Sequence, residues 1–386
     1  MLLLALMLAG QQAVVEPSAP QADVVITGNR MRDALDKCLA RNCPPEEEVD
    51  AAMNAGAESF SAGRYDEAKA ILRRAISRNR KYALRMPGPV SDLYATYADV
   101  TEHEGDNEAF RHATRESVDV LRDALGRSHP LALRVSARVG DMWVKLGNPD
   151  SADSAYRDAA EEAARAGNTD MAAALTFRRA WLALSAKQIE RSRRLLDQLE
   201  LGQGKDPRFA RPLRILRARI AVARDGEGGT DELIAALRAT QGAQPVLVYE
   251  PPYPEFDTDG TPGLTQDGSV DVMASRSAGA REANLAWADI GYWVRPDGRP
   301  AEVEILRPSR DGQWAKPLIE HIKARRYVPA TQDADGLGAY RVERFTLRPA
   351  RGVPTGSHIR LRTGAPTLHA IDLTRLAQRD GTAPQP

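Results

Sequence analysis

A repeated arrangement of small residues constrains the fold of this chain more than any other feature. Gly63, Gly105 and Gly147 follow one another at intervals of 42 residues. Residues at fixed spacing precede each glycine by seven positions and follow it by five and twelve. These companions are Gly56, Ala98 and Gly140 before the glycines, and Ala68, Phe110, Ala152, Ala75, Ser117 and Ala159 after them. A fourth copy, shifted by two residues, contains Ala180, Ser192 and Leu199.

This spacing predicts a series of helical hairpins. Small residues at fixed positions let two antiparallel helices pack with their axes about 8–10 Å apart. A glycine between the helices ends the first one, because glycine adopts the left-handed conformation at little cost. We expect Asp66, Asn107 and Asn148 to cap the second helices, with Pro149 in a first turn.

The hairpins resemble the tetratricopeptide repeat (TPR) family, whose small-large-small signature these positions match. Their period is longer than the usual ~34 residues and is similar to the long-helix repeats of kinesin light chains. The sequence "LGRSHP" at 125–130 resembles the linker between such repeats. The resemblance implies a solenoid with a concave, polypeptide-binding groove. Candidate groove residues on first helices are Asn54, Tyr94, Thr101 and Arg138. The alternative is an alanine-rich helical domain whose spacing is accidental.

Length and charge limit the domain count and the class of partner. A chain of 386 residues suggests two or three domains. Its formal net charge of zero argues against a general nucleic-acid binder, which carries a basic field. We assign 51–241 to the solenoid, including a last helical pair at 209–225 and 230–240.

The first residues resemble an export signal. "MLLLALMLAG" is an apolar run too short for a membrane span of ~20 residues, and it is similar to the core of a secretory signal peptide. We therefore expect a signal at 1–22 and a periplasmic protein that is possibly membrane-associated. The alternative is a buried terminal helix. "DVVITG" at 23–28 is a strand candidate, and it also resembles the TonB box of outer-membrane receptors.

The segment 23–50 contains Cys38 and Cys43, the only two cysteines. An oxidising compartment would join residues this close as a local disulfide. Two independent buried thiols are the alternative. A zinc site is disfavoured because no histidine lies nearby, and the spacing is not the redox pattern C-x-x-C.

After a proline- and glycine-rich linker at 242–269, the pattern changes to strands. We predict strands at 284–294, 301–306 and 340–349, with a helix at 312–327 between the last two. Val303 and Ile305, Val342 and Phe345 are the expected core residues, and His321 is expected to face out of the helix or flank it. The fold class is therefore mainly α, with a TPR-type solenoid followed by a small α+β domain of antiparallel strands and one packed helix. The last stretch, 351–386, is a C-terminal extension without a motif.

The region 270–350 and the "YEPPYPE" segment at 249–255 resemble the C-terminal domain of TonB. The matching features are "GYWVRPDGRPAEVEIL" at 291–306, a helix, "RRYVPA" at 325–330 and "VERFTLRP" at 342–349. "PSRDG" at 308–312 departs from the usual Ser-Ser-Gly, and an insertion follows the Tyr-Pro segment. A solenoid stands where a TonB protein carries its membrane anchor and stem. The resemblance implies a module that binds extended peptides.

The sequence contains no catalytic constellation. The six histidines are scattered and lack metal-ligand spacing, and no nucleophile elbow or phosphate-binding glycine loop occurs. They are His103, His112, His129, His321, His358 and His369. We expect no catalytic residues, no metal and no cofactor, and hence a protein that is not an enzyme.

These observations predict a non-enzymatic scaffold of the bacterial cell envelope that links one partner in the TPR groove to another on the TonB-like module. Its partners are expected to be proteins, possibly an outer-membrane receptor or an envelope complex, and not nucleic acids or small-molecule substrates. One alternative is a divergent energy transducer for outer-membrane transport. Another is an envelope enzyme with an unrecognised site.

Overall fold

The computed structural model describes residues 30–204, 206–225, 230–237, 244–254, 256, 285–309, 312–329, 338–348, 351–352, 361–362 and 367–374. The expected signal at 1–22 and the "DVVITG" segment lie outside the described residues. Positions 257–269 of the predicted linker and most of the extension at 351–386 also lie outside the described residues.

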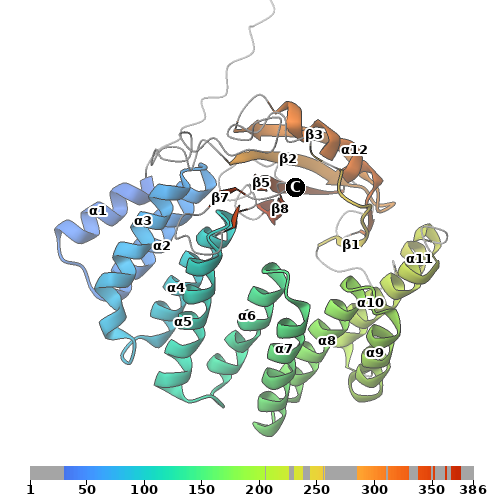
Figure 1. Ribbon diagram of the computed structural model, residues 1–386, viewed down its shortest axis with the longest axis horizontal. Helices are drawn as coiled ribbons and strands as arrows, with labels where there is room; N and C mark the ends of the chain where they lie inside the picture. The colour runs from blue at the N-terminus through green and yellow to red at the C-terminus, as the bar shows by residue number, and fades with distance from the viewer. Residues whose placement is uncertain are drawn as a thin grey trace, which may run out of the picture.

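The amino-terminal part of the chain is an array of antiparallel helices that curves into an arc (Figure 1). This confirms the predicted helical repeat fold. The helices are α1 (Arg30–Ala40), α2 (Pro45–Ser61), α3 (Tyr65–Asn79), α4 (Pro87–His103), α5 (Asn107–Leu125), α6 (Pro130–Lys145), α7 (Pro149–Arg165), α8 (Thr169–Ser185), α9 (Ile189–Gln203), α10 (Pro207–Asp225) and α11 (Thr230–Leu237).

The repeated small residues lie where the two helices of a hairpin touch. A Cβ atom added at Gly140 in α6 would lie 2.2 Å from Cε1 of Tyr156 in α7. One added at Gly56 in α2 would lie 3.0 Å from Cγ of Leu72 in α3. Larger side chains would force the paired helices apart, which explains the small-residue spacing in the sequence.

The turns inside the first three hairpins use the predicted glycines. Gly63, Gly105 and Gly147 have φ angles of 78°, 74° and 71°. In the shifted fourth copy Lys187 takes this place with φ 59°. The left-handed turn is therefore retained even where the glycine is not.

The predicted helix caps are right at one turn and wrong at two. Asn148 accepts a hydrogen bond from the amide of Ser151 at 3.0 Å, and Pro149 opens α7. The cap of α5 is Asp106, one residue before the predicted Asn107. Asp66 is not a cap, because α3 begins one residue earlier, at Tyr65. A carboxylate in the first turn still interacts favourably with the helix dipole.

The carboxy-terminal part is a four-stranded antiparallel sheet with strand order β3-β2-β5-β8. The predicted strands correspond to β2 (Ala286–Val294), β3 (Pro300–Pro308) and β5 (Ala339–Arg348). The fourth strand, β8 (Thr367–Asp372), was not predicted from the sequence. A two-stranded pair of β1 (Val246–Tyr249) and β4 (Arg326–Val328) adjoins the sheet, and β6 (Arg351–Gly352) pairs with β7 (Leu361–Arg362).

One face of the sheet is covered by α12 (Lys316–Ala324), which follows the short 3₁₀ helix Gln313–Ala315. Leu318 and Ile322 of α12 are fully buried against Ile290 and Phe345 of the sheet. His321 was expected to face out of the helix or flank it, but it is only 6% exposed. The prediction for His321 was therefore wrong, and the reason is the "YEPPYPE" segment, whose Tyr253 ring stacks on the imidazole at 4.4 Å.

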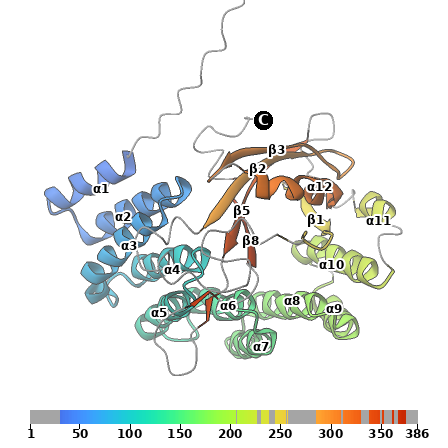
Figure 2. The ribbon, with the colours of Figure 1, turned by 45° about the horizontal axis from the view of Figure 1, so that its top comes forward.

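The other face of the sheet is turned toward the helical array. In both views the sheet lies across the open side of the arc, and α4 and α6 are nearer to it than α5 and α7 (Figures 1 and 2). We call α2, α4, α6, α8 and α10 the inner helices. Residues near both ends of the array contact the carboxy-terminal strands.

Candidate interaction site

Strand β5 lies across the carboxyl ends of two consecutive inner helices. Successive side chains of a strand point to opposite faces, so Arg344, Thr346 and Arg348 share one face. Arg344 reaches the end of α2, while Thr346 and Arg348 reach the end of α4. Alternate residues of β5 therefore contact the ends of successive inner helices.

All five N–H donors of Arg344 have acceptors, although its side chain is fully buried. Nε and Nη2 donate to the carboxylate of Asp289 on β2 at 2.6 and 3.0 Å. Nη1 donates to the Phe60 carbonyl and the Tyr65 hydroxyl, both at 3.0 Å, and Nη2 to the Ser61 carbonyl at 2.9 Å. Phe60 and Ser61 end α2, where a cation also complements the helix dipole.

Trp287 completes this contact beside the first repeat turn. The guanidinium carbon of Arg344 lies 4.1 Å from the centre of the Trp287 ring, within cation–π range. A Cβ atom added at Gly63 would lie 2.8 Å from Cζ2 of the same ring. Gly63 therefore serves both the left-handed turn and the close approach of Trp287.

The end of α4 is held through Glu102. Its carboxylate accepts from Arg348 at 3.1 Å and lies 2.7 Å from Nε2 of His369 on β8. Lys145 of α6 lies 3.5 Å away on the helical side. Burial alone would raise the pKa of Glu102, but the hydrogen bond with His369 and the charges of Lys145 and Arg348 outweigh it and lower the pKa to about 2.

His103 lies at the centre of the same contact and is fully buried. Its Nε2 is 3.1 Å from the Thr346 hydroxyl, and its ring is 5.6 Å from that of His369. Burial, followed by the positive fields of His369, Arg348 and Arg344, holds the pKa of His103 well below its usual value. Burial is also the main reason why the pKa of His369 is lowered. We call Glu102, His103, Arg344, Thr346, Arg348 and His369 the polar contact.

The far end of the array meets the carboxy-terminal strands through apolar side chains. The cluster consists of Ala218, Ile234, Leu237, Val248 and Val328, from α10, α11, β1 and β4. Arg219 of α10 donates to the Leu247 carbonyl of β1 at 2.9 Å and stacks on Trp181 of α8 at 4.1 Å. We call the five aliphatic residues of this cluster the apolar contact.

The "YEPPYPE" segment is fastened to the sheet domain by a buried charge cluster. Glu250 lies 2.6 Å from Nη2 of Arg325 and 3.2 Å from Nε2 of His321. Nη1 of Arg325 also contacts Glu343 at 2.7 Å, so one guanidinium joins two carboxylates. Tyr253 donates to Glu250 at 3.0 Å. These contacts give Glu250 and Tyr253 a structural role.

Between the polar and apolar contacts, α6 presents a stripe of side chains on the inner side of the array. The spacing of three, four, three and four residues keeps them on one face. Arg138 reaches Asp92 of α4 at 3.5 Å, and Asp141 accepts from Arg178 of α8. The stripe comprises Leu131, Arg134, Arg138, Asp141 and Lys145, of which Leu131, Arg134 and Lys145 are exposed. We call it the inner stripe.

The predicted groove residues divide into two groups. Arg138 lies on the inner stripe, and Asn54 is exposed on α2. Tyr94 is buried, and Thr101 turns its hydroxyl back to the Ala98 carbonyl at 3.0 Å. Tyr94 and Thr101 therefore pack inside the helical array, and the prediction that they line a groove was wrong.

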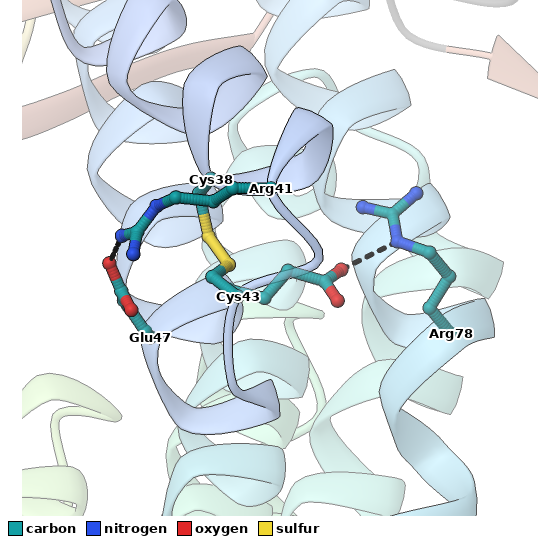
Figure 3. Close-up of a disulfide and its surroundings, with 6 residues drawn as sticks. Cys38, Arg41, Cys43, Glu47 and Arg78 are labelled. Carbon is teal, nitrogen blue, oxygen red and sulfur yellow. Dashed lines mark hydrogen bonds and ion pairs between the residues drawn. A yellow bond between two sulfur atoms is a disulfide. The ribbon is translucent and has the colours of Figure 1, made fainter.

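The paired cysteines lie where α1 meets α2 (Figure 3). The structure joins Cys38 to Cys43, with Cα atoms 5.1 Å apart. Ion pairs flank the bridge, one between Arg41 and Glu47 and one between Glu48 and Arg78 of α3. The disulfide therefore closes the turn between α1 and α2.

The described residues hold no group of three or more histidine, cysteine or acidic side chains that could bind a metal ion. None of the described helices is long and apolar enough to cross a membrane.

Comparison with known proteins adds little beyond the repeat architecture. No family model and no curated protein matches the chain. A Podosopora anserina protein described as a kinesin light chain with nearly identical TPR-like repeats is 15% identical, with 51% of this chain and 95% of that chain covered and a TM-score of 0.40. The apo form of RapI is 10% identical, with 55% and 82% covered and a TM-score of 0.36. The described part of the chain is an array of helical hairpins that carries a small antiparallel sheet.

Sequence reasoning missed most of the polar contact. His103 and His369 were considered only as scattered histidines, and Arg344 and Arg348 were not considered. One signal was available in β2, where Trp287, Asp289 and Gly291 form a face that is apolar only in part. That face is the one turned to the helices, while the alternate residues Ala288, Ile290 and Tyr292 form the core with α12.

Proposed function

We propose that this protein is a non-enzymatic scaffold of the bacterial cell envelope that binds a polypeptide partner on its inner helices. The observation that carries the proposal is the inner stripe of α6, which lies between the two places where the sheet meets the array. Helical repeats generally use their inner surface to bind extended partners. A class of partner follows from the chemistry of the stripe.

The inner stripe combines both signs of charge with an apolar residue. Arg138 and Asp141 are each engaged with a neighbouring inner helix. Lys145 is exposed and lies near Glu102 of α4, and Arg134 is exposed. The chain as a whole has a formal net charge of zero. Such a surface suits a polypeptide of mixed charge better than a nucleic acid, whose phosphates require a net basic field.

The carboxy-terminal sheet would supply the second binding function of the scaffold. Its order of strands and helix agrees with the TonB-like resemblance, which motivates an envelope role. The sheet has two edge strands, β3 and β8, and we consider strand addition at β3. That edge carries Pro300 and Pro308 at its ends, two register shifts against β2 and Glu302 at φ 52°. Bulges and prolines make an edge a poor template, so we assign partner binding primarily to the inner helices.

Export is supported by the apolar run at the start of the chain and by the Cys38–Cys43 bridge, since disulfides persist in oxidising compartments. Fractionation of the native host, with the amino-terminal sequence and free-thiol count of the mature protein, tests the location. We expect a cleaved periplasmic protein without free thiols. A cytoplasmic protein with two free thiols would rule out the envelope assignment but not polypeptide binding.

Site-specific photo-crosslinking tests the binding surface. A photoreactive residue at Arg134 on the inner stripe is compared with one at Asp158, exposed on the outer helix α7. We expect the same protein adduct to form repeatedly from position 134 and not from position 158. Equal labelling from both positions, or no adduct from position 134, would contradict binding on the inner helices.

A further inference from the structure

The polar contact contains a buried histidine whose surroundings favour the neutral form of the ring. His103 is fully buried, and its Nδ1 has no hydrogen-bond partner among the described residues. Its Nε2 is occupied by the Thr346 hydroxyl at 3.1 Å. A proton added to Nδ1 would have no acceptor, and burying an unpaired charge is costly.

Most charged groups around His103 are cations. Arg344 and Arg348 face it from β5, and His369 faces it from β8. Glu102, its neighbour on α4, is engaged by Arg348, His369 and Lys145 of α6. Tyr65 of α3 packs on the His103 ring at 4.7 Å, and burial raises the pKa of Tyr65 to about 12, so it stays neutral. A protonated His103 would thus face Arg344, which is paired with Asp289, and Arg348, which shares the Glu102 carboxylate. In acid it would also face a protonated His369.

The contact also disfavours protonation of His369. Its Nε2 is hydrogen-bonded to Glu102 at 2.7 Å, while its Nδ1 is buried without a partner among the described residues. Arg348 and Lys145 oppose a charge on this ring, and burial does so most strongly. Acid therefore adds positive charge at two adjacent rings, 5.6 Å apart, that lie on opposite sides of the junction.

The two attachments of the sheet differ in their response to protons. The apolar contact buries Ala218, Ile234, Leu237, Val248 and Val328, none of which titrates. The polar contact is formed almost entirely by charged and hydrogen-bonding groups, as in interfaces that open and close. A change of pH can weaken the polar contact and leave the apolar contact in place.

From this geometry we propose that the polar contact is an acid-released latch and that the apolar contact is the hinge about which the sheet swings away from α2 and α4. Opening exposes His103 and His369 to water and uncovers the carboxyl ends of α2 and α4. The proposal is independent of the identity of any binding partner.

The direction of the effect follows from proton linkage. A histidine in the open state has an ordinary pKa of about 6.5, and the closed state lowers it. Closure is therefore favoured above pH ~6.5 and is lost as the pH falls below it. The open-to-closed ratio should rise about tenfold per pH unit for one histidine and up to about a hundredfold for two.

Spin labels on the full-length chain, with its disulfide intact, measure the opening. One pair is placed at Arg111 on α5 and Glu320 on α12, both exposed, and a second at Arg214 on α10 and Glu320. When the pH is lowered from 7.5 to 5, we expect a population with a longer distance to increase for the first pair. The distance of the second pair should stay unchanged. An unchanged distance in the first pair would overturn the latch, and equal changes in both pairs would overturn the hinge.

Histidine variants test the assignment to the latch. H103Q and H369Q together should abolish the pH response, whereas H112Q, at a side chain 73% exposed on α5, should retain it. A pH profile unchanged by H103Q and H369Q would overturn the role of these two rings.

A surface variant keeps the test decisive if the buried substitutions prevent folding. Lys145 is 43% exposed and opposes the charge of His369 from the helical side. K145Q should therefore move the midpoint of opening to lower pH. A midpoint that is unchanged or higher would contradict the proposed electrostatic origin.

Discussion

The sheet is attached to the helical array at two places by opposite kinds of chemistry. At α2 and α4 the contact consists of an arginine with five hydrogen bonds, a shared carboxylate and two histidines. At α10 and α11 it consists of small and branched aliphatic side chains. Apolar contacts are nearly insensitive to pH and direction, whereas buried polar contacts depend on both. The protein therefore joins one lasting attachment to one conditional attachment.

The largest expected effect comes from Arg344, at the centre of the polar contact. R344A leaves Asp289 paired only with the half-exposed Arg307 and removes the donors that satisfy the end carbonyls of α2. Breaking a buried pair in this way costs about 3–5 kcal/mol. Urea unfolding measures the loss. R307A is the matched control, because Arg307 also binds Asp289 at 2.7 Å but is 46% exposed, so it should cost about 1 kcal/mol or less. Equal losses would refute a special role for Arg344.

The next effect concerns the apolar contact. Ile234 of α11 is 1% exposed and packs among the aliphatic residues of that cluster. I234A should cost about 2–4 kcal/mol through lost burial and the remaining cavity. The loss should be the same at low and high salt, because the buried aliphatic side chains carry no charge that salt could screen. A salt-dependent loss in I234A would weaken the comparison between the two contacts.

The lowered pKa of Glu102 predicts that the free energy of unfolding decreases at acidic pH. Its pKa is lowered from 4.5 to about 2 in the folded state. In the closed state this stabilisation is complete above pH ~4.5, where the carboxylate is charged in both the folded and the unfolded chain. It is lost as the pH falls toward 2 or as the polar contact opens. The shift corresponds to roughly 2–3 kcal/mol. E102Q should flatten the pH dependence of the unfolding free energy between pH 4.5 and 2. A slope equal to that of the wild type would show that other carboxylates produce it.

The smallest effect separates two glycines with the same backbone conformation. Gly63 and Gly147 both have positive φ, so G63A and G147A share the strain of a left-handed alanine. Only Gly63 lies against Trp287; a Cβ atom at Gly147 would meet nothing within 4 Å in the described structure. G63A should be the more destabilising by about 1–2 kcal/mol in thermal unfolding. Equal melting temperatures would indicate that the Trp287 contact is readily adjusted.

The parts of the fold that could be predicted are those encoded at short range. The spacing of Gly63, Gly105 and Gly147 with their small companions predicted each hairpin, because the packed positions are few residues apart. Alternation predicted β2, β3 and β5 for the same reason. Asn107 was chosen over Asp106 as a cap because both residue types cap well, and only the backbone shows which one precedes the first helical residue.

The interaction site was less predictable. Polar residues on alternate positions of β5, Arg344, Thr346 and Arg348, are indistinguishable in sequence from a solvated face. The strand β8 has no pattern of its own, and it is stabilised by pairing with β5 and by the contact of His369 with Glu102. Tyr94 and Thr101 were placed in a groove because helix periodicity does not say which neighbour a face will meet.

The sequence by itself determined the helical hairpins, the turns between them and the succession of strand, strand, helix and strand along the carboxy-terminal part, since these depend on spacing along the chain. Only the tertiary structure decided that the sheet lies across the array and that Arg344 and Arg348 cap α2 and α4. The hydrogen bond from Arg344 to the Phe60 carbonyl joins residues 284 positions apart. No local pattern encodes such a contact, because it depends on the curvature accumulated over all the intervening helices.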